Sequence, residues 1–77
     1  MDASAVVLTV TVTEPVGAGF VTVFPCGSPL PLASNVNFAA GATVANSVVS
    51  RVGSGGRVCV FTSAQTHLVV DVDGFFP

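Results

Sequence analysis

The chain has 77 residues, of which 51% are hydrophobic and only 8% are charged, and its formal net charge at pH 7 is −2. An ordinary globular domain is about 25% charged. Because Arg51 and Arg57 are its only basic residues, the chain lacks the clustered cations that neutralise phosphates, and we expect no nucleic-acid partner. Its apolar runs are far shorter than the roughly 20 residues of a spanning helix, so we also expect no insertion into a membrane.

The length predicts one small module over residues 1–77. A domain of this size buries only about 60% of the surface that its unfolded chain exposes. Its core alone rarely contributes more than roughly 3–5 kcal/mol. We therefore expect a further source of stability, either a disulfide or contacts with neighbouring modules or chains.

The first expected strand covers residues 6–13, where aliphatic residues alternate with threonine and valine. This period of two is typical of a strand that is buried on one face. The face that we expect in the core carries Val6, Leu8, Val10 and Val12. Glu14-Pro15 ends the strand, and Gly17–Gly19 is expected to form the next turn.

Five further short strands follow in the chain. We expect them at Phe20–Phe24, Ala33–Ala39, Thr43–Val52, Arg57–Thr62 and Thr66–Asp73. The last should turn a second aliphatic face, Leu68, Val70 and Val72, toward the core. Gly53–Gly56 predicts a tight hairpin turn, because glycine supplies the positive φ that such turns require. Six short strands without helical spacing predict an all-β fold, a small antiparallel β-sandwich or barrel.

Cys26 and Cys59 are the two cysteines of the chain. We interpret them as one structural disulfide, worth roughly 3–4 kcal/mol by the loop-closure argument. A redox pair would favour Cys-x-x-Cys spacing, and a zinc site would need two more ligands. The single histidine, His67, would still leave such a site incomplete.

Several runs resemble a repeat found in large secreted and cell-surface proteins of actinobacteria. They are AVVLTVTVTEP at Ala5–Pro15, TVFPCGSPLP at Thr22–Pro31, ASNVNF at Ala33–Phe38 and THLVVDVDGFF at Thr66–Phe76. The resemblance covers nearly the whole chain after Ser4. It implies an accessory or spacer role beside hydrolase or adhesion regions. The family's repeat begins with a further N-terminal stretch, which this chain lacks.

The polar residues do not assemble a catalytic set in the sequence. His67 and Asp71 are four residues apart on one expected strand, about 13 Å when extended, whereas a triad needs its members to converge. Asp71 and Asp73 could begin a calcium loop, but they lie at a strand end without a later Glu. We interpret them as a solvated strand edge, and we expect no catalytic residue, metal or cofactor.

Two other features predict surface contacts. A proline-rich loop is expected after the second strand, because proline lacks the donor that a central strand needs. It supplies a candidate binding loop, which comprises Pro25, Ser28, Pro29 and Pro31. The first strand is free of charge and of proline, so its other face is a candidate assembly strand. That face carries Val7, Thr9, Thr11 and Thr13.

Two hypotheses for the function follow. The first is a non-enzymatic structural or adhesive module, secreted or at the cell surface, that self-associates into a homo-oligomer or fibre. Few charges, high apolar content and a disulfide favour it. The alternative is a module that binds carbohydrate, such as a cell-surface glycan, or another surface ligand through its loops. The absence of Trp and Tyr weakens the alternative, because sugar sites usually use aromatic platforms.

Overall fold

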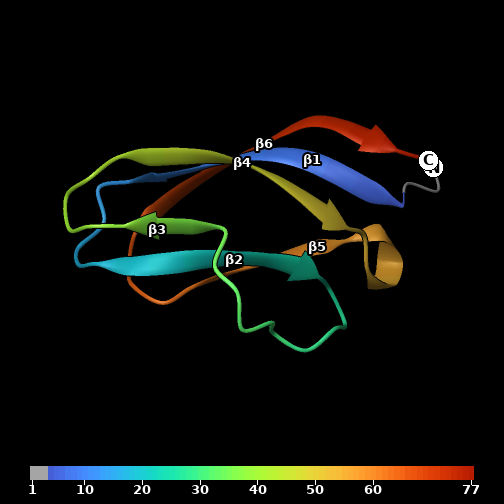
Figure 1. Cartoon of the computed structure of the whole chain (residues 1–77), viewed down its shortest axis with the longest axis horizontal. Helices are drawn as coiled ribbons and strands as arrows, with labels where there is room; N and C mark the ends of the chain where they lie inside the picture. Colours follow the sequence, from blue (N-terminus) through green and yellow to red (C-terminus); the bar gives the residue numbers. More distant parts are fainter. Residues whose placement is uncertain (1–3) are drawn as a thin grey trace.

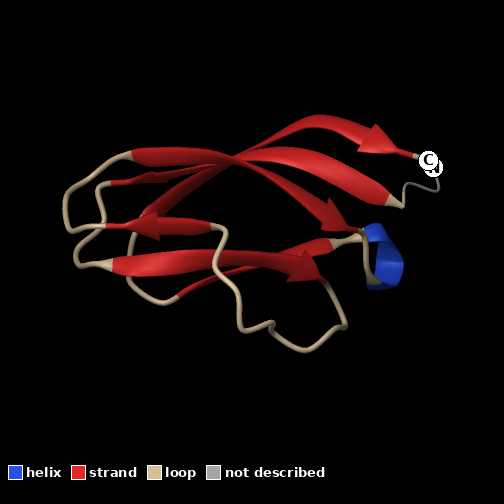
Figure 2. Cartoon of the chain, viewed as in Figure 1, coloured by secondary structure: helices blue, strands red, loops and turns tan. Residues whose placement is uncertain are grey.

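The computed structural model describes residues 4–77 and contains six strands in two three-stranded antiparallel sheets (Figures 1 and 2). Sheet A has the order β4-β1-β6, with β4 at Val44–Arg51, β1 at Ala5–Thr13 and β6 at His67–Phe76. Sheet B has the order β3-β2-β5, with β3 at Val36–Phe38, β2 at Gly19–Pro25 and β5 at Val58–Thr62. The expected all-β sandwich is confirmed.

The chain changes sheet at every connection between strands except the one from β2 to β3. The expected hairpin at Gly53–Gly56 is therefore wrong. Ser54–Gly56 instead form a single 3-10 turn between β4 and β5, which belong to different sheets. Gly55 and Gly56 do have positive φ, so the glycines serve a tight turn, but this turn joins the two layers.

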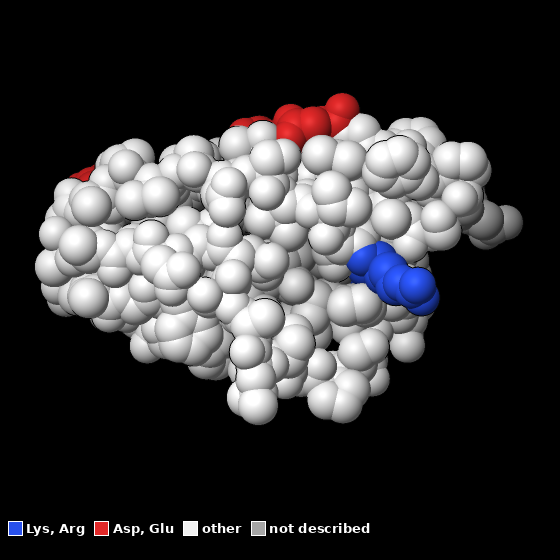
Figure 3. Space-filling view, viewed as in Figure 1, with Lys and Arg blue, Asp and Glu red and all other residues white. Residues whose placement is uncertain are grey.

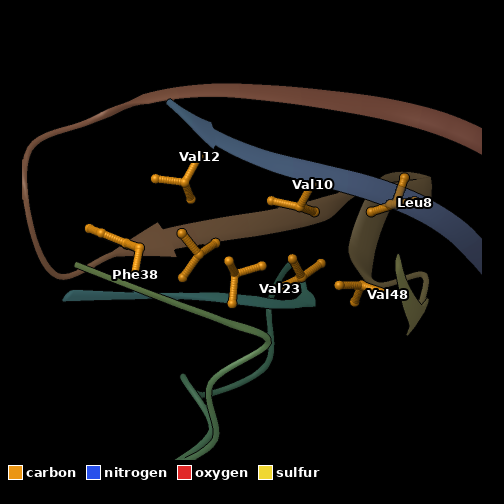
Figure 4. Close-up of a cluster of buried hydrophobic side chains, with 8 residues drawn as sticks. Leu8, Val10, Val12, Val23, Phe38 and Val48 are labelled. Atoms are coloured by element: carbon orange, nitrogen blue, oxygen red, sulfur yellow. The ribbon is translucent and has the colours of Figure 1, made fainter. Parts of the chain in front are cut away.

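The core lies where the inner face of β1 meets sheet B (Figure 4). Leu8, Val10 and Val12 are buried, and Val10 and Val12 are fully inaccessible to solvent. Val6, the fourth residue of that face, is half-buried against them. The residues that cover them from sheet B are Val21, Val23, Val36 and Phe38. The alternation predicted for the first strand is confirmed, because Thr9, Thr11 and Thr13 are only half-buried.

The central place of β1 explains why this alternation is so regular. β4 pairs with one of its edges and β6 with the other, both antiparallel. Nine residues of β1 have partners in β6, and eight have partners in β4. One register shift interrupts the β1–β6 ladder, because Val7 pairs with Gly74 but Leu8 pairs with Val72. Asp73 is the extra residue of this β-bulge.

The inner face of β1 should tolerate no charge. Val10→Asp would bury an unpaired carboxylate in the core, and we expect it to lower the free energy of unfolding by about 4 kcal/mol or more. Thr11→Asp, the control on the outer face, should cost less than about 1 kcal/mol. Urea unfolding followed by circular dichroism measures both. Equal losses for the two variants would contradict the register.

Candidate functional site

The two cysteines are bonded, as expected, and they fasten one end of sheet B. Cys26 follows the last residue of β2, and Cys59 lies in β5 beside it, with a Cα–Cα distance of 5.0 Å. The disulfide therefore joins neighbouring strands of one sheet, near the turn that leads to the other sheet. No free cysteine remains among the described residues.

The turn from sheet A packs directly on the backbone of this disulfide. The N–H of Ser54 donates to the carbonyl oxygen of Cys26 at 2.8 Å, and the N–H of Gly53 donates to that of Arg57 at 2.9 Å. A Cβ atom at Gly53 would lie 2.2 Å from the Cys26 oxygen, closer than atoms can approach. The close approach of two backbones, and not a positive φ, thus requires glycine at residue 53.

The prediction that the first strand adds to a neighbour's sheet is wrong. β1 is the central strand of sheet A, and both of its edges are already paired. The predicted assembly residues lie on its outer face, where β4 and β6 flank them. These residues are Val7, Thr9, Thr11 and Thr13. The sequence showed a strand free of charge, but such a pattern does not distinguish a central strand from an edge.

The outer face of sheet A carries a polar stripe next to the acidic residues of β6. Thr9 lies opposite Asp71, and its hydroxyl donates to the carboxylate of Asp73 at 2.5 Å. Figure 3 shows acidic atoms along the sheet A side of the molecule, one basic patch toward the right of the view, and no other charged atoms on this face. As expected, both carboxylates point away from the core and are exposed to solvent.

The inner face of β6 departs from the prediction that it lies in the core. Leu68, Val70 and Val72 do face inward, because they pair with Val12, Val10 and Leu8. Only Leu68 packs against the core. Val70 is 41% exposed and Val72 is 67% exposed, because sheet B does not reach beneath this edge. We call Leu68, Val70 and Val72 the open stripe.

Sequence reasoning missed the open stripe because its alternation is the same as that of a covered face. A signal was nevertheless present in the composition. The described chain contains more aliphatic strand faces than a second sheet of three strands can cover, and β3 is only three residues long. Phe75, which pairs with Val6 beyond the bulge, extends the exposed apolar surface along the same edge.

The loop between β2 and β3 folds back across the outer face of sheet B. The hydroxyl of Thr22 donates to the carbonyl oxygen of Ala33 at 2.6 Å, and the N–H of Val23 donates to Oδ1 of Asn35 at 2.6 Å. These bonds hold the loop beside the ring of Phe20 and border a cavity of about 330 Å³. Its lining comprises Phe20, Leu30, Pro31, Leu32, Ala33 and Ser34.

The candidate binding loop coincides with this cavity only in part. Pro31 belongs to the lining, whereas Pro25, Ser28 and Pro29 do not. Pro25 ends β2 and pairs with Val58. The ring of Phe20 lies 6.0 Å from that of Phe61, with the ring planes inclined at 44°. The cavity and this aromatic pair form an uncharged patch on sheet B.

The other polar residues that were considered for a catalytic or metal site do not lie close together. His67 is exposed at the start of β6, opposite Thr13. No three His, Cys, Asp or Glu side chains within residues 4–77 are grouped closely enough to hold a metal ion. The same residues include no helix of the length and hydropathy that crossing a membrane requires.

Comparisons with family models, curated proteins and solved structures found no match to this chain. The functional interpretation therefore depends on the surfaces described above.

The disulfide should account for a large share of the stability. Replacing both cysteines, Cys26→Ser with Cys59→Ser, should lower the free energy of unfolding by roughly 3–4 kcal/mol, because the unfolded chain regains the entropy of an open loop. Urea unfolding measures the loss, and the wild-type chain treated with reductant is the control. A double variant as stable as the untreated wild type would show that the bond contributes nothing.

Proposed function

We propose that the chain is a non-enzymatic structural or adhesive module of a secreted or cell-surface protein and that it self-associates into an oligomer or fibre. The observation that carries this proposal is the open stripe on β6. Val70 and Val72 expose aliphatic surface on a strand that has an unpaired edge among the described residues. Such an edge presents free N–H and C=O groups that can pair with another strand.

The distribution of charge also favours association. The chain has two basic and four acidic residues, too few to keep apolar surfaces apart by repulsion. Large apolar residues are exposed on both sheets, among them Val49, Phe61, Val69 and Phe76. Contiguous exposed apolar surface marks sites of contact between proteins.

The disulfide and the resemblance to secreted repeats both support a secreted or cell-surface location. Disulfides persist in oxidising surroundings such as the extracellular space and are rare in the cytosol. The Cys26–Cys59 bond holds the end of sheet B and its junction with the turn to sheet A, a structural role. The resemblance implies a spacer or accessory unit.

A second proposal is supported by the cavity beside Phe20. The loop of residues 25–32 would bind a surface ligand such as a glycan, using Phe20 and Phe61 as the apolar platform. Clean hits on a glycan array that are lost in Phe20→Ser would favour this function. No binding to any glycan would reject it.

The proposed self-association predicts a mass that depends on concentration. Size-exclusion chromatography with light scattering, run over a dilution series, should give species larger than 7.7 kDa at high micromolar concentration, and these should dissociate on dilution. Burial of the open stripe provides the driving force. A single species of 7.7 kDa at every concentration would contradict the proposal.

A further inference from the structure

Strand addition at β6 would bury apolar surface that the chain itself leaves exposed. Val70 and Val72 lie on the inner face, next to the buried core residues Val10 and Leu8. A strand added to the free edge of β6 would continue that face, and its side chains would contact both valines from the side. It would also satisfy the backbone groups of the edge.

The free edges of the other outer strands are less suited to the addition of a strand. β3 has three residues and β5 has five, whereas β6 has ten. β4 is long enough, but Val48 and Ser50 on its inner face are buried and Val44 packs against the core. Within residues 4–77, a long free edge coincides with an uncovered apolar face only at β6.

A second copy of β6 fits this edge better than an arbitrary strand because β6 is self-complementary. The regular part of the strand runs from His67 to the bulge at Asp73 and is centred on Val70. Antiparallel pairing about Val70 places Leu68 opposite the partner's Val72. The open stripes of both copies then form one aliphatic surface on one face of the sheet.

The polar residues on the other face agree with the same register. Pairing about Val70 places His67, the only nitrogen-bearing side chain of β6, opposite the partner's Asp73. Pairing about Asp71 would instead set two like charges directly opposite each other, which is destabilising. Pairing about Val69 would place Val72 opposite Thr66 of the partner subunit, outside the strand.

We propose that two copies of this chain pair antiparallel through the outer edges of β6, in register about Val70, and form one continuous six-stranded sheet. The inference rests on the proposed self-association and specifies its partner and its contact. Because the two-fold axis makes the same patch serve both copies, the contact closes on itself and produces a dimer. A fibre would need a second, different contact.

A single new cysteine tests the register. In Val70→Cys the two thiols would lie directly opposite each other, with Cα atoms about 4.5–5.5 Å apart, within the range of a disulfide. The native cysteines are already bonded, and Val70 is partly exposed, so the variant should fold. Val49→Cys, at a position 64% exposed on β4, is the matched control.

Mild oxidation at a concentration where the wild type associates should convert Val70→Cys into a covalent dimer and leave Val49→Cys monomeric on a non-reducing gel. Peptide mapping should find the bond between the two copies of residue 70. If the wild type associates but Val70→Cys does not cross-link, or if Val49→Cys cross-links instead, the pairing of two β6 edges is overturned, whereas self-association itself stands. A wild type that remains monomeric overturns both.

A charge variant tests the same register without a new thiol. In the dimer of His67→Asp, each new carboxylate would lie opposite Asp73 of the partner subunit. We expect this repulsion to raise the dissociation constant about five-fold or more. His67→Gln, which removes the imidazole without adding a carboxylate, is the control. Unchanged affinity in His67→Asp would exclude the pairing of His67 with Asp73 of the partner subunit.

Discussion

The packing of Leu8, Val10 and Val12 against sheet B is the interaction on which the fold depends. These residues lie on a strand that is paired on both sides, so they hold β4 and β6 in place while they pack on β2 and β3. The disulfide and the turn around Gly53 then fix the end where β5 enters sheet B.

The same packing explains why one side of the molecule remains open. Sheet B has a three-residue strand at one edge and a five-residue strand at the other, and it covers β1 and β4 but not β6. The chain therefore buries Leu8, Val10 and Val12 and leaves Val70 and Val72 exposed. With little charge to counter association, this exposed edge is the feature that connects the structure to the proposed role in assembly.

Much of the fold could be predicted because alternation reports directly on which face of a strand is buried. It placed Val10 in the core and Thr11 outside, and it located all six strands to within a few residues. Alternation carries no information about which strands are neighbours. The central position of β1, the crossing at Gly53–Gly56 and the exposure of Val72 all depend on that pairing, so alternation could not show that both edges of β1 are paired.

Hydrogen exchange on the wild-type chain at two concentrations tests most directly whether β6 is left uncovered by its own chain. In dilute solution the amides of β1 should be protected, and the amides of β6 that point away from β1 should exchange rapidly. At a concentration where the chain associates, residues 67–73 should gain protection while the amides of β4 remain unchanged. Full protection of β6 in the dilute chain, or a gain confined to β4, would contradict the account.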